Sequence, residues 1–167
     1  MECGIERLDR LCVAMTAYEE GDPGRIQHFV KVHAFARLIG IEEGLQAAEQ
    51  EILEAAAYVH DIGIKPSLEK YGDCSGKKQE AEGPAPAAKM LRELGFSEET
   101  TERVAWLVAH HHTYEGIDSA DWQILVEADF LVNLFEGNND RQGICRVYET
   151  VFRTTAGKQL CKTMFGL

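Results

Sequence analysis

The sequence lacks the marks of a β-sheet, a membrane span and a secreted protein. Only four of its 167 residues are proline, and no alternating run of β-branched residues bounded by turns predicts a strand. No apolar stretch reaches the ~18 residues that a membrane-spanning helix needs. The N-terminal segment MECGIERLDRLC is charged and has no apolar core of the kind found in signal peptides. We therefore expect a cytoplasmic protein.

Paired cysteines are also missing. The five cysteines are odd in number and irregularly spaced, and no two of them form a CxxC pair. This pattern predicts free thiols in a reducing compartment. The cysteines are Cys3, Cys12, Cys74, Cys145 and Cys161.

Positive charge is scarce. The chain has 17 Lys and Arg residues against 28 Asp and Glu residues, which gives a net charge of -11, and the pI is about 5.0. An acidic surface repels long nucleic acids, whose affinity comes from phosphate neutralisation. It is compatible with a small phosphorylated substrate, because a bound metal or a lysine cluster overrides the overall field locally. We expect no nucleic-acid or membrane partner.

Helical periodicity, in contrast, runs along almost the whole chain. Hydrophobic residues make up 45% and charged residues 27% of the sequence, which fits one globular domain at this length. We predict an all-α, single-domain bundle of about six to eight helices. Its motif-bearing core covers about residues 20–136, and C-terminal helices over 140–165 pack on it. The expected helices begin near residues 5, 23, 42, 84, 98, 121, 140 and 155.

Local signals set several helix ends. Asp22 followed by Pro23 predicts an N-cap and a first helical residue, and Ser97 predicts another N-cap. Gly40 predicts the end of the helix that begins at Pro23. Residues 62–80 (IGIKPSLEKYGDCSGKKQE) break the periodicity and predict a long functional loop.

Metal-binding side chains fall on several of the expected helices. His28 lies in the middle of one, and the pair His60-Asp61 closes the next. Asp129 lies on an apolar face, where a carboxylate is costly unless it is paired or metal-bound. For Asp129 a salt bridge and a metal both stay open, and each histidine alone also fits a core or helix-capping role.

Three successive histidines, His110, His111 and His112, follow a further helix. Neighbours differ by ~100° around a helix, so only one or two of them are expected to face a common site. His111 continues an apolar face and is the first choice, His110 is the second, and His112 is expected in the loop. Imidazole and carboxylate ligands without thiolate suit Mn²⁺, Fe²⁺, Co²⁺, Ni²⁺, Zn²⁺ or Mg²⁺.

The order His28, His60-Asp61, Asp129 resembles the HD superfamily of metal-dependent phosphohydrolases, and in particular its small stand-alone bacterial members. The resemblance covers roughly residues 20–136. The similar segments are RIQHFVKVHAFAR, AAAYVHDIGI, EGPAPAAKMLRELGFSEE, RVAWLVAHHH and VEADFLVNLFE.

The resemblance implies a metal centre with one or two divalent ions. His28, His60, Asp61 and Asp129 would hold the first ion, and Asp61 would bridge to a second ion held by His111 or His110. Two-metal members often supply a further histidine after the HD motif, whereas the segment SGKKQEAEG has none. Glu80 or Glu82 is the expected substitute, and a centre with one ion is the alternative.

The expected activity is hydrolysis of a small phosphate ester, with a nucleotide among the candidates and with monoesters and diesters both open. A metal-bound hydroxide is the nucleophile, and Asp61 and His60 are the predicted catalytic residues. The cations near these ligands in the sequence are candidate phosphate binders, although each also fits an ordinary surface charge. They are Arg25, Lys65, Lys77 and Lys78.

Two other functions stay open. One is a diiron oxygenase, since some HD-type sites bind redox iron. The other is a non-catalytic regulatory module that binds a metal or a nucleotide, although the completeness of the ligand set argues against it. Apolar residues on the last helices also suggest a homodimer. They are Val147, Val151, Phe152 and Phe165.

Overall fold

The computed structural model describes residues 4–167, with side chains from residue 6 onward, and every regular element in this part of the chain is an α-helix. The all-α prediction is confirmed, but the described residues form ten helices rather than six to eight. They are α1 (Gly4–Tyr18), α2 (Pro23–Glu42), α3 (Ala47–Val59), α4 (Ile64–Tyr71), α5 (Gly76–Glu82), α6 (Pro84–Glu93), α7 (Glu98–Val108), α8 (Ala120–Glu136), α9 (Arg141–Thr150) and α10 (Thr155–Phe165).

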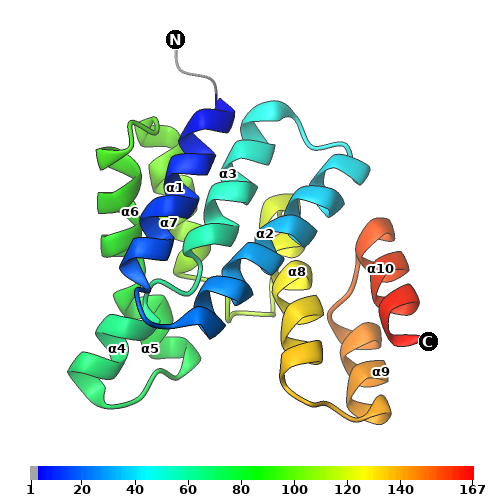
Figure 1. Cartoon of the computed structure of the whole chain (residues 1–167). Coiled ribbons are helices and arrows are strands. Elements are labelled where there is room, and N and C mark those ends of the chain that lie inside the picture. Colours follow the sequence, from blue (N-terminus) through cyan, green and yellow to red (C-terminus); the bar gives the residue numbers. More distant parts are fainter. Residues whose placement is uncertain (1–3) are drawn as a thin grey trace.

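Helix α3 lies at the centre of the bundle. It packs against α1, α2, α7 and α8, while α4 to α6 lie on one side and α9 and α10 on the other (Figure 1). The second half of α3, from Leu53 onward, is buried on every face, and its three successive alanines, Ala55 to Ala57, are fully buried. Small side chains let the surrounding helices approach closely, so the C-terminal end of α3 is carried into the middle of the core.

The prediction of a long loop over residues 62–80 is wrong. The two short helices α4 and α5 occupy most of this stretch. Its glycines serve a helix end and close packing: Gly72 ends α4 with a φ of 72°, and a Cβ on Gly63 would lie 2.4 Å from the carbonyl oxygen of Gln79. Short helices with few apolar residues give too weak a periodic signal to be read from sequence.

Gly40 does not end α2, which continues to Glu42, and α3 begins at Ala47 rather than near Glu42. A Cβ on Gly40 would lie 2.9 Å from Leu53 Cδ2, so this glycine permits the close contact of α2 with α3. Both predicted N-caps are confirmed. The Asp22 carboxylate accepts from the backbone N–H of Arg25, and the Ser97 hydroxyl accepts from that of Thr100.

A buried carboxylate ties the C-terminal helices to the rest of the bundle. Glu127 on α8 is fully buried, and its Oε1 accepts the backbone N–H groups of Arg153 (2.6 Å) and Thr154 (2.9 Å). The Thr154 hydroxyl donates to the other oxygen. Thr154 is also the N-cap of α10, so a charge buried in α8 fixes where α10 begins.

The apolar residues that suggested a homodimer pack on the chain's own core. Phe152 is fully buried, and Val147, Val151 and Phe165 are half-buried against the core cluster. Cys3 lies outside the described residues, and the four cysteines within them are free thiols. None of the helices in the described residues is long and apolar enough to cross a membrane.

We expect Gly157→Ala to destabilise the fold, because the new Cβ would lie 1.9 Å from Glu127 Oε2. Overpacking of this kind costs about 1–3 kcal/mol. Gly24→Ala is the matched control in a first helical turn, since its Cβ meets Asp22 Oδ1 only at an ordinary 3.4 Å. Equal unfolding free energies in urea for the two variants would contradict the described clamp.

Candidate metal centre

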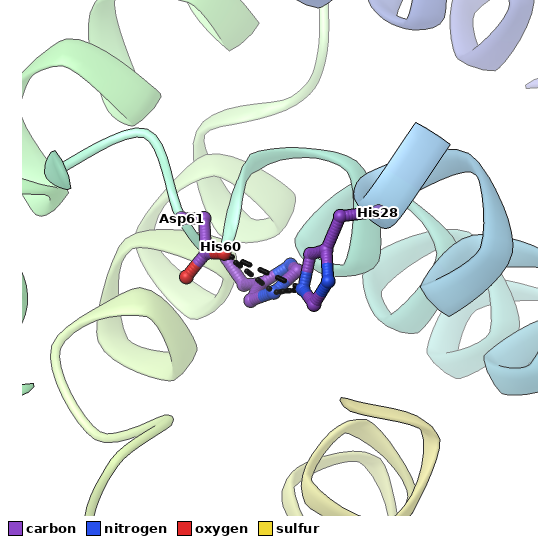
Figure 2. Close-up of side chains that lie close together, drawn as sticks. All are labelled: His28, His60 and Asp61. Atoms are coloured by element: carbon purple, nitrogen blue, oxygen red, sulfur yellow. Dashed lines mark hydrogen bonds and ion pairs between the residues drawn. The ribbon is translucent and has the colours of Figure 1, made fainter. Parts of the chain in front are cut away.

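Five side chains from four regions of the bundle meet beside the C-terminal end of α3. His28 comes from α2, His60 and Asp61 follow α3, His111 follows α7, and Asp129 lies on α8. Figure 2 shows the rings of His28 and His60 turned toward one another with the Asp61 carboxylate beside them. His60 is fully buried, and His28, His111 and Asp129 are nearly so. The Asp61 side chain, in contrast, is 24% exposed.

The distances between the donor atoms match those of ligands that share one ion. His28 Nε2 lies 3.1 Å from Asp129 Oδ1, 3.3 Å from His60 Nε2 and 3.4 Å from Asp61 Oδ2. His60 Nε2 lies 3.5 Å from both carboxylates. Two ligands at about 2.1 Å from one ion, at tetrahedral or octahedral angles, are about 3.0–3.4 Å apart.

Hydrogen bonds to the other ring nitrogens fix the tautomers of these histidines. Each Nδ1 faces an oxygen, so it carries the proton and donates it, and each Nε2 turns its lone pair into the centre. The acceptors are Glu136 Oε2 for His28 (2.8 Å), the Ala57 carbonyl for His60 (2.8 Å) and the Val108 carbonyl for His111 (2.7 Å).

The centre favours a positive charge. Burial alone lowers the pKa of His60, but the charge of Asp61 and the hydrogen bond to Asp129 outweigh it and raise the pKa to about 9. Burial raises the pKa of Asp129, yet its hydrogen bonds with His28 and His60 hold that pKa well below the usual range. Two carboxylates surrounded by lone pairs therefore call for a cation, either a proton or a metal ion.

His111 supplies a direct test of whether a metal fits. Its Nε2 is buried and, among the described residues, has no hydrogen-bond partner, although it lies 3.5 Å from Asp61 Oδ1. An unpaired buried lone pair is costly unless a cation meets it. The donor set therefore fits a divalent ion held by His28, His60, Asp61 and Asp129, with His111 on the other side of Asp61.

A second group of donors adjoins the first. Asp61, His111 and His112 place ligand atoms within 4.8 Å of one another. His112, which sequence placed in the loop, is held by Gln79: its Nε2 lies 3.1 Å from Gln79 Oε1, and the Gln79 amide donates to the Cys74 carbonyl. Gln79 belongs to the segment SGKKQEAEG, in which the further histidine of two-metal members is missing.

The structure does not bring His110 to the centre. Its Nδ1 donates to the carbonyl of Trp106 (2.7 Å), and its ring stacks on the indole of Trp106 at 3.9 Å. Helix α7 ends at Val108, so the three histidines follow a turn and no longer keep helical spacing. Their directions depend on that turn, which the sequence pattern does not reveal.

Neither predicted substitute ligand reaches the donor atoms. Glu80 accepts the backbone N–H of His112 (3.0 Å) and the Thr113 hydroxyl (2.9 Å), so it braces the segment that carries the histidines. Glu82 binds Lys70 and the Tyr71 hydroxyl, both at 2.7 Å, on the surface.

The four predicted phosphate-binding cations separate into two pairs. Arg25 and Lys65 line one surface cavity. Arg25 pairs with Asp22 (3.1 Å), and Lys65 donates to the Tyr18 carbonyl (3.0 Å). Lys78 pairs with Asp73 at the start of α5, and Lys77 is exposed. Phosphate binding by these cations stays a prediction.

Two further residues position the ligands and were missed from sequence. Glu136 accepts from His28 and also pairs with Lys31. The Asn133 amide donates to Asp129 Oδ1 at 2.8 Å. Both lie on the face of α8 that carries Asp129, four and seven residues further on, and this spacing is the signal that would have indicated them.

The sequence model of the HD domain matches residues 25–140, and the chain belongs to this family. Its fold is similar to the crystal structure of a predicted HD superfamily hydrolase from an uncultured Thermotogales bacterium. The TM-score is 0.68 at 21% identity, over 95% of this chain and 84% of the other. No curated protein matches the sequence.

The protein as purified is expected to carry metal that His60→Ala or Asp129→Ala removes, because each variant deletes a donor atom from a buried set. His110→Ala is the matched control and is expected to keep the full metal content, since its ring stacks on Trp106. Elemental analysis per chain checks both. Full metal content in His60→Ala would show that the centre is misassigned.

Glu136→Ala is expected to weaken metal binding roughly 10- to 100-fold, the usual cost of losing a group that orients a ligand. Glu136→Gln should lose less, because the amide oxygen still accepts from His28 Nδ1. Competition against a chromogenic chelator measures both affinities. An unchanged affinity in the alanine variant would mean that His28 does not depend on this contact.

Proposed function

We propose that this chain is a metal-dependent phosphohydrolase that acts on a small phosphate ester, with nucleotides among the candidate substrates. The observation that carries the proposal is that the candidate ligands are buried except for one carboxylate, which is partly exposed to solvent. His60 and Asp129 are sealed in the core, whereas Asp61 remains 24% exposed at its side chain. An ester that reaches the centre therefore meets it at Asp61.

A divalent ion held by His28, His60, Asp61 and Asp129 supplies Lewis-acid chemistry, neutralising phosphate charge and acidifying water. The chain's own residues supply position. The Asp61 side chain is the ligand that stays partly exposed, so it would accept a hydrogen bond from the attacking water and orient it. Asn133 donates to Asp129 Oδ1, so it would keep this carboxylate in position.

The surroundings favour a small anionic ester over a polymer. The net charge of -11 opposes the approach of a long nucleic acid. A single phosphate needs only a local positive site, which the centre supplies. Arg25 lies three residues before His28, and Lys65 lies four residues after Asp61, so both are candidate phosphate binders.

The test is phosphate release from a panel of monoesters and diesters by the protein loaded with the metal found by elemental analysis. Asp61→Asn is expected to lower kcat/KM by roughly 100-fold or more, since it removes a group that positions the nucleophile. His110→Ala should keep the wild-type rate.

Three results would contradict the proposal. Phosphate release that survives Asp61→Asn would place the reaction elsewhere. An iron–oxygen absorption band without any phosphate release would favour the diiron oxygenase. Tight nucleotide binding without turnover would favour a regulatory module.

A further inference from the structure

His112 carries its ring proton on a different nitrogen from the three histidines of the metal centre. The Gln79 side-chain amide donates to the Cys74 carbonyl (2.7 Å), so its oxygen Oε1 is turned toward His112 Nε2, at 3.1 Å. An amide oxygen only accepts hydrogen bonds, so Nε2 of His112 carries a proton and donates it. In the three histidines of the centre, the proton lies on Nδ1 instead.

The other ring nitrogen of His112 is also occupied. Its Nδ1 lies 3.1 Å from the Tyr114 hydroxyl. In a neutral ring with the proton on Nε2, that hydroxyl donates and Nδ1 accepts. A second proton on the ring would remove this last lone pair. In either charge state, His112 has no free lone pair for a metal ion.

Helix α5 holds the His112 ring in this arrangement. Gln79 is only 7% exposed, so water does not compete for its oxygen. Glu80, the next residue, accepts the backbone N–H of His112 (3.0 Å). A Cβ on Gly76 would lie 2.9 Å from Cγ of His112, so the backbone at the start of α5 packs directly on the imidazole. Contacts to both the backbone and the ring therefore fix the direction of His112.

This arrangement leaves the second group of donors incomplete. The group consists of Asp61, His111 and His112, whose ligand atoms lie within 4.8 Å of one another. Without His112, two protein donors remain, and Asp61 is also a ligand of the first ion. Zinc sites in proteins use three or more protein ligands. A second ion would have to displace the proton of His112 Nε2 and break its hydrogen bond to Gln79.

We propose that this chain binds one divalent ion rather than two, and that Gln79 sets this stoichiometry by holding His112 as a hydrogen-bond donor. The inference rests on the metal centre of the proposed phosphohydrolase. His111 Nε2, which has no partner among the described residues, and Asp61 Oδ1 are then left as neighbouring acceptors for water or substrate. Gln79 is in this sense a positioning residue, because it acts on the ion only through His112.

The first test is a titration of the metal-free protein with Mn²⁺, in which electron paramagnetic resonance counts the ions bound per chain. The wild type is expected to saturate at one ion. Gln79→Leu is expected to bind a second ion, because His112 Nε2 loses its acceptor and the proton can move to Nδ1, facing the Tyr114 oxygen. Gln159→Leu, at an exposed position on α10, is the matched control and is expected to stay at one.

The second test locates the protons directly. Long-range proton–nitrogen correlation spectra of the isotope-labelled, Zn²⁺-loaded protein show which nitrogen of each imidazole is protonated. His112 is expected to carry its proton on Nε2, whereas His28, His60 and His111 are expected to carry it on Nδ1. His112→Ala identifies the signal. A residue that serves only the fold would not select the ring nitrogen that is protonated, and the wild-type spectrum tests the inference even if Gln79→Leu fails to fold.

The outcomes are distinct. Two Mn²⁺ ions per wild-type chain, or a His112 ring protonated on Nδ1 alone, would overturn the inference. A folded Gln79→Leu that stays at one ion would overturn the role of Gln79. One ion per chain without phosphate release from any ester would overturn the proposed function and leave this inference standing. No bound ion in the wild type would overturn both.

Discussion

Each of three buried imidazoles donates its Nδ1 proton to a fixed oxygen, and the rest of the centre depends on that arrangement. The acceptors are backbone carbonyls in the last turns of α3 and α7 and the Glu136 carboxylate on α8. Because Nδ1 carries the proton, the Nε2 lone pairs of His28, His60 and His111 point toward the carboxylates of Asp61 and Asp129. Such a site is stable only with positive charge in it.

The fold brings these groups together because the parts of the chain that carry them are buried. α3 is enclosed on all sides over its second half, so the residues that follow it, His60 and Asp61, emerge inside the molecule rather than at its surface. α2 and α8 pack against α3 and against each other, which brings His28 and Asp129 to the same point. Among the ligands, Asp61 has the most exposed side chain.

Much of this was predictable because helical periodicity is a local property. Short stretches of sequence are enough to predict the all-α class, the caps at Asp22 and Ser97, and the order of the histidine and aspartate residues. The directions of three histidines after a helix are not, because they depend on a turn that begins at Ala109. The prediction that Gly40 ends its helix was wrong for a similar reason, because this glycine serves the contact of α2 with α3. The roles of Gln79 and Glu136 depend on partners far along the chain, His112 and His28.

Anomalous diffraction from crystals, at the absorption edge of the metal found in the protein, tests the ligand set most directly. We expect an ion at about 2.0–2.2 Å from the Nε2 atoms of His28 and His60 and from carboxylate oxygens of Asp61 and Asp129. A peak located elsewhere, or a fully occupied centre in which these atoms are joined by protons alone, would contradict this ligand set.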